Sequence, residues 1–354
     1  MSRFFSQRFL TLEPYTPGEQ PQDMQYVKLN TNESPFPPSR KASEAAKAAA
    51  ERLQLYSDPE CRLLREKYSE ITGVSPDEVI FTNGSDEVLN FAFMAFCDET
   101  HPAAFPNISY GFYPVFARLN GVPYTELPLR SDFTVDTDAY CGLKSTIFLA
   151  NPNAPTGIAL RPAQIESILR SNPDNVVVVD EAYVDFGAES CIGLIKRYDN
   201  LLVVQTFSKS RSMAGARLGF GVGNPEIIRD LNTIRYSTNP YNVNSMTMAA
   251  GIGALSDEEY TRQNCRVIME NRAFTTNALR EMGFAVTDSQ ANFIFMKHES
   301  MGGEAIYREL KARGVLVRHF AKPEIEDYNR VTIGTKEQMQ IFLKTLKAIL
   351  EGEK

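Results

Sequence analysis

Three apolar runs decide the fold of this chain: Ser145-Thr-Ile-Phe-Leu-Ala-Asn-Pro-Asn153, Val176-Val-Val-Val-Asp-Glu-Ala-Tyr-Val-Asp-Phe186 and Leu201-Leu-Val-Val-Gln-Thr-Phe-Ser-Lys-Ser210. Each run has the length of a strand and is apolar without alternation, which is typical of strands buried on both faces of a parallel sheet. Helix-forming segments precede and separate these runs. The alternation of β and α elements therefore predicts a large, doubly wound α/β domain with a mostly parallel sheet.

The segments before these runs continue the alternation. Residues 41–55 are rich in helix formers, and residues 61–73 repeat apolar side chains at helical spacing up to a terminal glycine. Residues 79–84 predict a short strand, and residues 85–96 predict a helix with two acidic residues in its first turn. We expect the large domain to span residues 41–256.

The pattern changes after about Ser256. A long helix over residues 257–282 is expected first, and the capping-box pattern Thr335-x-x-Gln338 predicts the start of the last helix. Between them the sequence predicts strands over 284–287, 291–297, 315–318 and 330–334, and a helix over 304–314. These elements predict a small α+β domain over residues 257–354. The Pro-rich residues 1–40 are expected to form an N-terminal arm and small-domain segment, with a loose tail as the alternative.

Composition excludes several classes of protein. The 354 residues carry 37 Lys+Arg and 44 Asp+Glu, a net charge of −7, which argues against nucleic-acid binding. Neither a signal peptide nor a membrane span is recognisable. The five cysteines are scattered, which favours buried free thiols in a reducing compartment, and the three histidines form no metal motif. We expect a cytoplasmic protein without a metal.

Polar residues follow the predicted strands at four places, where ligands bind in doubly wound sheets. Asn83-Gly84-Ser85 offers backbone N–H groups to an anion, and Asn151-Pro-Asn153-Ala-Pro-Thr-Gly157 forms a turn that aims polar side chains. Asp180 ends an apolar strand and needs a cationic partner, while Lys209 offers an amine whose pKa burial lowers. Singly, these features are also explained by an N-cap, a plain turn, a salt bridge and a surface lysine. Together they match the demands of pyridoxal 5′-phosphate.

These motifs, with Thr206-Phe-Ser208-Lys209 and Arg217, resemble those of the fold-type I aminotransferases, which depend on pyridoxal 5′-phosphate. Pro14-Tyr15, Leu29-Asn-Thr-Asn-Glu-Ser-Pro35 and Tyr56 are similar to the histidinol-phosphate branch of that family. The resemblance runs from about Tyr15 to Gly334, nearly the whole chain. It implies the PLP-dependent transferase fold of type I and a homodimer.

The resemblance also implies a role for each matching residue. Lys209 would hold the cofactor covalently and move the substrate proton, Asp180 would keep the pyridine nitrogen protonated, and Tyr183 would hydrogen-bond the phenolic oxygen. The other residues implied to bind the cofactor are Gly84, Ser85, Asp86, Tyr110, Asn153, Thr206, Ser208, Arg217 and, from the neighbouring subunit, Tyr56. The residues implied to bind the substrate are Asn32, Asn153, Arg318, Arg330 and Tyr15 of the partner arm.

The implied reaction is the transamination of histidinol phosphate with 2-oxoglutarate in histidine biosynthesis. Both Arg318 and Arg330 are expected to end strands of the small domain, where an unpaired guanidinium needs an anion, and either could hold the substrate phosphate. An aromatic amino-acid aminotransferase and a decarboxylase of a phosphorylated amino acid are the alternatives. The chain departs from the family at Ala154, where an asparagine is usual, and at Arg211, which could either add charge near the cofactor or lie on the surface.

Overall fold

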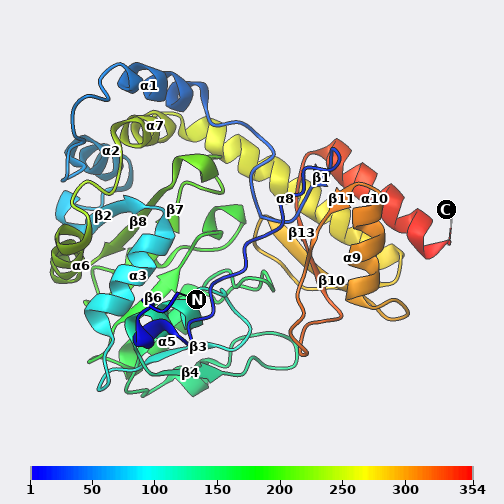
Figure 1. Ribbon diagram of the computed structural model, residues 1–354, viewed down its shortest axis with the longest axis horizontal. Helices are drawn as coiled ribbons and strands as arrows, with labels where there is room; N and C mark the ends of the chain where they lie inside the picture. Colours follow the sequence, from blue (N-terminus) through cyan, green and yellow to red (C-terminus); the bar gives the residue numbers. More distant parts are fainter. Residues whose placement is uncertain (1, 353–354) are drawn as a thin grey trace.

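A seven-stranded sheet forms the centre of the larger part of the molecule in this computed structural model, which describes residues 2–352 (Figure 1). Its strands follow the order β2-β8-β7-β6-β5-β3-β4. They are β2 (Val79–Asn83), β3 (Ala103–Pro106), β4 (Tyr124–Leu127), β5 (Thr146–Ala150), β6 (Val177–Asp180), β7 (Leu201–Thr206) and β8 (Leu218–Gly223). The sheet is parallel from β4 to β7, whereas β8 runs antiparallel to both of its neighbours.

Helices cover both faces of this sheet, as the apolar strands predict. Alternate residues of one strand enter different cores: Val177 and Val179 pack in one, and Val178 packs in the other. Three helices pack in the core of Val178: α3 (Ser85–Phe96), α4 (Tyr113–Asn120) and α6 (Pro225–Thr238). Four pack in the other core: α1 (Arg40–Ala50), α2 (Arg62–Thr72), α5 (Pro162–Ser171) and α7 (Ser245–Leu255). The predicted doubly wound fold is therefore confirmed.

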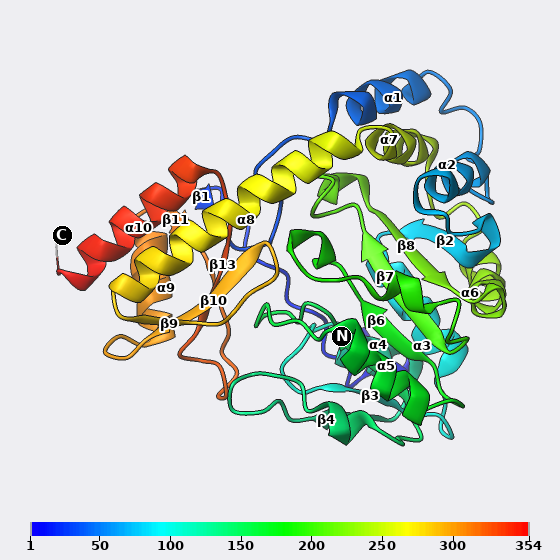
Figure 2. The ribbon, with the colours of Figure 1, turned by 180° about the vertical axis from the view of Figure 1, so that it is seen from behind.

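The long helix α8 (Glu258–Glu281), yellow in Figures 1 and 2, leads from this part into a smaller one. There β12 (Arg318–His319), β13 (Asn329–Thr332), β10 (Phe293–His298) and β9 (Phe284–Val286) form an antiparallel sheet in that order. The helices α9 (Gly303–Ala312) and α10 (Lys336–Leu350) pack with it in one apolar core. Near the N-terminus, β1 (Val27–Lys28) pairs in parallel with β11 (Val315–Leu316).

Short 3₁₀ helices complete the secondary structure. They are η1 (Gln7–Phe9), η2 (Pro76–Glu78), η3 (Thr137–Tyr140), η4 (Val184–Phe186), η5 (Cys191–Leu194) and η6 (Ala214–Ala216).

Several local predictions can be compared with this structure. Gly73 ends α2 with φ 75°, and Thr335 and Gln338 form the predicted capping box of α10. The predicted strand 315–318 is wrong as one element, because the chain leaves the pairing with β1 after Leu316 and joins β13 from Arg318. Arg318 therefore begins a strand and Arg330 lies inside one, so neither ends a strand as expected.

All five cysteines are free, and Cys61, Cys191 and Cys265 are buried as expected, whereas Cys97 is partly exposed and Cys141 is exposed, which corrects the expectation for these two. Among residues 2–352, none of the helices combines the length and the apolar character that a membrane crossing requires.

Candidate active site

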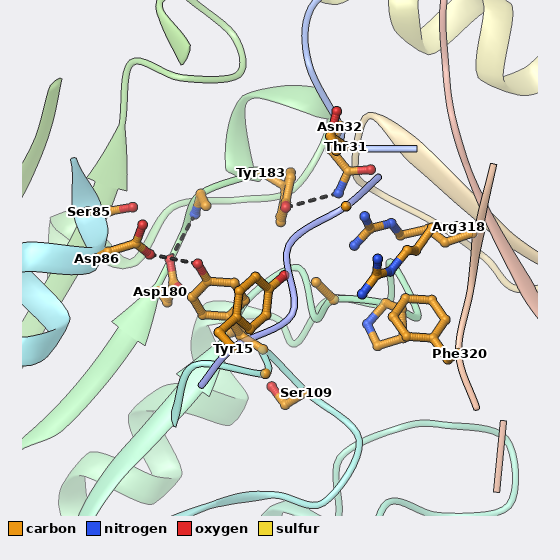
Figure 3. A pocket seen from close by; sticks show the side chains of 18 of the residues that line it. Tyr15, Thr31, Asn32, Ser85, Asp86, Ser109, Asp180, Tyr183, Arg318 and Phe320 are labelled. Atoms are coloured by element: carbon orange, nitrogen blue, oxygen red, sulfur yellow. Dashed lines mark hydrogen bonds between the residues drawn. The ribbon is translucent and has the colours of Figure 1, made fainter. Parts of the chain in front are cut away.

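A cavity of about 680 Å³ opens at the carboxyl ends of β5, β6 and β7, between the two parts of the molecule (Figure 3). Most of the residues expected at the site line it: Tyr15, Asn32, Ser85, Asp86, Tyr110, Asp180, Tyr183, Thr206, Ser208, Lys209, Arg217, Arg318 and Arg330. Three expected residues, Gly84, Asn153 and Tyr56, lie outside its lining. The strand-end rule for doubly wound sheets thus locates one concave site.

Lys209 follows β7 and projects into this cavity. Its Nζ donates a hydrogen bond of 3.2 Å to the backbone carbonyl of Thr31. Burial, together with the nearby Arg330 guanidinium, lowers the pKa of Lys209 to about 8. A usable fraction of this amine is therefore neutral near pH 7, and a neutral amine can attack a carbonyl.

Asp180 ends β6 as a buried carboxyl without a protein cation. Its Oδ2 accepts a hydrogen bond from the Tyr113 hydroxyl at 3.2 Å, and its Oδ1 accepts one from the Ala182 N–H at 3.3 Å. No Lys, Arg or His within residues 2–352 pairs with it, and burial raises its pKa to about 7. The cationic partner expected for Asp180 therefore does not come from the described protein residues. A protonated nitrogen of a ligand would fit this position.

The N-terminus of α3 forms an anion cradle beside these groups. Gly84 precedes the helix with φ 81°, and Ser85 is its first residue. A Cβ on Gly219 of β8 would lie 2.1 Å from the Ser85 nitrogen, so only glycine allows β8 to approach the helix so closely. The Arg217 guanidinium donates to Asp86 Oδ2 at 3.2 Å. Backbone N–H groups, the helix dipole and Arg217 together suit a phosphate.

Hydroxyl groups surround the cradle. Thr206 Oγ1 donates to Ser208 Oγ at 2.9 Å, and the Tyr110 hydroxyl donates to Asp86 Oδ1 at 2.6 Å. Gly219 was not identified from the sequence as part of the site. Its packing role depends on the β2–β8 pairing, which joins residues 135 to 143 positions apart in the chain and leaves no local sequence signal.

Tyr183 and Asn153 differ in their relation to the cavity. The Tyr183 hydroxyl accepts a 3.0 Å hydrogen bond from Asn32 Nδ2, drawn as a dashed line in Figure 3. Asn153 is buried behind the lining, where its Nδ2 donates to the Ile108 carbonyl at 3.0 Å and its Oδ1 accepts from Ser109 Oγ at 2.8 Å. Ser109 lines the cavity and was not identified from the sequence.

Arg318 and Arg330 lie directly opposite each other on β12 and β13. The Arg330 guanidinium donates to the Asn30 carbonyl at 2.9 Å, and burial lowers its pKa. Arg318 donates to the backbone carbonyls of Thr16 and Pro17, each at 3.2 Å. Among the residues that the structure describes, neither arginine has a carboxylate within ion-pairing distance. Two adjacent guanidiniums facing one cavity are suited to anionic ligands.

A further cation, Lys322, also lines the cavity and was not identified from the sequence. Its Nζ donates to the Asn107 carbonyl at 2.7 Å across the opening between the two parts. No motif marks this lysine in the sequence, because it lies in an irregular loop after β12.

Three further residues singled out in the sequence are Tyr15, Tyr56 and Arg211. Tyr15 lies in the cavity of its own chain, stacked on Phe112 with ring centroids 4.2 Å apart. Tyr56 is 84% exposed and stacks on Tyr241. Arg211 is not part of the cavity lining: its side chain is 12% exposed and lies between Asp185, at 3.4 Å, and Glu258, at 3.1 Å.

The cavity therefore combines an anion cradle, a carboxyl that lacks a cation and an amine with a lowered pKa. Gly219 adds no side-chain atom beside the Ser85 nitrogen of the cradle, and a protonated nitrogen of a ligand would fit beside the Asp180 carboxyl. These features fit pyridoxal 5′-phosphate and define a PLP-dependent enzyme of fold type I.

Comparison with known proteins narrows this class. The chain matches the family Aminotransferase class I and II over residues 24–346. It is 46% identical over 354 residues to the histidinol-phosphate aminotransferase of Brachyspira hyodysenteriae, covering 99% of this chain and 100% of the relative. It is 44% identical over 348 residues to that of Clostridium acetobutylicum, covering 98% and 99%.

A solved structure agrees in fold. The histidinol-phosphate aminotransferase of Sinorhizobium meliloti in complex with pyridoxal-5′-phosphate matches this fold with a TM-score of 0.86. The two chains are 22% identical, and the match covers 93% of this chain and 92% of that one. The chain belongs to the aminotransferase class I and II family and, within it, to the histidinol-phosphate aminotransferases. Its cofactor is pyridoxal 5′-phosphate.

Proposed function

We propose that this enzyme interconverts histidinol phosphate and imidazole acetol phosphate, with 2-oxoglutarate and glutamate as the second pair, in histidine biosynthesis. Relatives of that name share 42–46% of its residues over nearly the whole chain. The single structural observation that carries the proposal is the pair Arg318 and Arg330, which face the cavity from neighbouring strands.

Two cations suit the two pairs of substrates. Glutamate and 2-oxoglutarate each carry two carboxylates, whereas histidinol phosphate has a phosphate and no carboxylate. A bidentate contact to Arg330, the more buried of the two arginines, would hold the α-carboxylate of glutamate. Arg318 would face the opposite end of either substrate, so it meets the phosphate in one half-reaction and the side-chain carboxylate in the other. Tyr15 and Asn32 line the same region and complete the proposed substrate site.

The cofactor, when bound, withdraws electrons from the substrate carbon that exchanges the amino group. Asp180 would keep the pyridine nitrogen protonated, and its buried position makes that ion pair strong. Lys209 would hold the cofactor and then carry the proton to and from the substrate Cα. Tyr183 would donate to the phenolic oxygen, beside Asn153.

The remaining proposed contacts hold the cofactor in place. Tyr110 would stack on the ring. The proposed phosphate contacts come from Gly84, Ser85, Thr206, Ser208, Arg217 and the partner subunit's Tyr56, and Asp86 would contribute its backbone N–H at the helix N-terminus. The cradle supports these assignments, because the Arg217 guanidinium lies against Gly84 and Asp86 at the N-terminus of α3, where the backbone N–H groups of the first turn are found.

The test of the cofactor site is Lys209→Ala. This variant should lose the yellow absorbance of the bound cofactor and the transaminase activity together. Lys344→Ala, at an exposed position of α10, is the matched control and should keep both. A Lys209→Ala protein that retained colour and activity would remove the basis for the assignment.

The test of the substrate is Arg318→Ala. Losing one charged hydrogen-bond partner should reduce kcat/KM for histidinol phosphate about 10- to 100-fold, with a smaller loss for an amino acid that has no second anionic group. Arg308→Ala removes an exposed arginine from α9 of the same domain and should change neither value. Equal losses on both substrates would contradict the proposed place of the phosphate. Carbon dioxide release, measured in parallel, separates amino transfer from decarboxylation.

We propose that two copies of the chain form a homodimer in the cytoplasm. Apolar side chains are exposed around the end of α1 and the start of α2, where Leu53, Leu55, Tyr56 and Leu63 are each more than half exposed. A second copy would cover them and receive Tyr56 at its cofactor site. Free cysteines support a reducing compartment. Sedimentation of wild type and Leu55→Asp tests the dimer: the wild type should be a dimer and the variant a monomer.

We also propose the domain limits 41–256 and 257–354, with residues 1–40 as the arm. The β1–β11 pairing supports joining the arm to the small domain. The limit at 257 coincides with Asp257, the N-cap of α8, and the limit at 41 lies two residues after Ser39, the N-cap of α1.

A further inference from the structure

A short chain of hydrogen bonds runs from the small domain to Tyr183. Thr332 Oγ1 accepts a hydrogen bond from the Asn32 backbone N–H at 2.9 Å and donates one to Asn32 Oδ1 at 3.1 Å. The oxygen end of the Asn32 amide is therefore held by Thr332. Its nitrogen end faces the Tyr183 hydroxyl at 3.0 Å and must be the donor there.

Asn32 is held firmly in this orientation. Its φ of 56° lies in the left-handed region, which Asn tolerates better than most residues. Its carbonyl accepts from Asn292 Nδ2 at 3.0 Å, and the Thr332 N–H donates to the Leu29 carbonyl at 2.9 Å. Asn32 and Thr332 are 1% and 3% exposed, so water does not compete for these contacts. An amide flip would leave buried groups unpaired at a cost of about 1–3 kcal/mol.

This arrangement decides where the Tyr183 proton points. The hydroxyl oxygen already accepts from Asn32, and among the described residues no protein atom accepts a hydrogen bond from it. Burial raises the pKa of Tyr183, so the phenol keeps its proton near neutral pH. Because Tyr183 lines the cavity, the remaining direction for its O–H is toward a ligand there.

We infer that Thr332 and Asn32 are positioning residues that turn the Tyr183 hydroxyl proton toward the phenolic oxygen of the cofactor. The inference rests on the proposed function, since it requires pyridoxal 5′-phosphate in the cavity. Thr332 belongs to β13 of the smaller part, whereas Tyr183 follows β6 of the larger one. The proton is therefore oriented only where the two parts pack together as they do here.

The pH titration of the holoenzyme absorbance tests this inference. A hydrogen bond donated to the phenolic oxygen stabilises its anionic form and lowers the pH midpoint of the colour change of the lysine-bound cofactor. Thr332→Val removes the hydroxyl and keeps the shape, and Asn32→Gly removes the amide at a φ that glycine accepts. Both should raise the midpoint by about half a unit to one unit, which is part of the roughly one- to two-unit rise expected for Tyr183→Phe.

Three comparisons make the result specific. Thr332→Ser keeps the hydroxyl and should restore the wild-type midpoint. Thr275→Val, a buried threonine of α8 whose hydroxyl bonds only its own helix, should leave the midpoint unchanged. The double variant Thr332→Val/Asn32→Gly should shift no further than Asn32→Gly alone, since both act through one contact.

An unchanged midpoint in Thr332→Val and Asn32→Gly proteins that bind the cofactor would overturn the inference, and so would additive shifts. These outcomes leave the proposed function standing, because wild-type colour and transaminase activity test it separately. A wild-type protein that stays colourless with pyridoxal 5′-phosphate would overturn both.

Discussion

Asp180→Asn should stabilise the cofactor-free protein while removing its ability to protonate the cofactor ring. Asp180 is a buried carboxyl that accepts hydrogen bonds from Tyr113 and Ala182 but has no cationic partner among residues 2–352. Asparagine has almost the same shape: its Oδ1 can accept the hydrogen bond of the Ala182 N–H, and its Nδ2 can donate to the Tyr113 hydroxyl oxygen. The substitution therefore removes the cost of a buried charge without opening a cavity.

The size of the effect follows from the pKa. Burial raises the pKa of Asp180 from 3.8 to about 7, a rise of about three units, which corresponds to about 4 kcal/mol. Below about pH 4 the carboxyl is protonated in both the folded and the unfolded chain, so the substitution changes little there. Between about pH 4 and pH 7 the unfolded chain ionises first, so wild-type stability falls through this window. Above about pH 7 the difference between wild type and Asp180→Asn is complete.

Urea unfolding of the cofactor-free proteins at about pH 4 and about pH 8 measures this difference. The variant should exceed wild type by a few kcal/mol at the higher pH and match it at the lower one. Asp185→Asn is the control with the opposite sign, because that carboxylate pairs with Arg211 and its loss should destabilise the protein. An Asp180→Asn protein with no advantage at pH 8, or with the same advantage at both pH values, would refute the reasoning.

Three further outcomes are expected. Gly219→Ala should destabilise the protein by about 1–3 kcal/mol in urea unfolding, because its Cβ would overlap backbone, whereas Gly215→Ala, which meets nothing within 4 Å, should be neutral. The rate at which Lys209 joins pyridoxal 5′-phosphate should rise with pH, reach half its maximum at about pH 8 and level off above it; Arg330→Met should move this half-maximal pH upward, since Arg330 lowers the pKa of Lys209. Arg211→Met should cost about 1–3 kcal/mol in thermal or urea unfolding, because it removes the charged hydrogen-bond partner that Asp185 and Glu258 share.

Much of the large domain could be predicted from the sequence because its signals are local. The apolar runs of β5, β6 and β7 need no partner to be recognised as buried strands, and α3 begins at the predicted Ser85. The first helix ends at Ala50, five residues before the predicted end at 55, since residues 51–55 form turns rather than helix. Helix propensity alone does not detect the loss of packing partners at a helix end.

The residues of the candidate site likewise fall into those that a local motif predicts and those that no local motif marks. Lys209, Asp180 and the Ser85 cradle each follow a strand in a short motif, and the carboxyl ends of parallel strands meet at one edge, so their convergence was predictable. Ser109 and Lys322 lie in loops without a motif and became visible only as cavity lining. Asn153 belongs to a recognisable motif, yet its amide hydrogen-bonds the Ile108 carbonyl behind the lining.

The sequence by itself determined the order of strands and helices, the class of cofactor and the identity of the groups that meet it, because periodicity, turn residues and short motifs are properties of neighbouring residues. Only the tertiary structure decided that Asp180 has no cationic partner among residues 2–352, that Arg211 is held by Asp185 and Glu258, and that Thr332 is connected to Tyr183 through Asn32. Those facts depend on burial and on contacts between residues as many as 300 positions apart. Burial and long-range contacts set the charge, the pKa and the direction of a proton, and they exist only once the two parts of the chain have packed together.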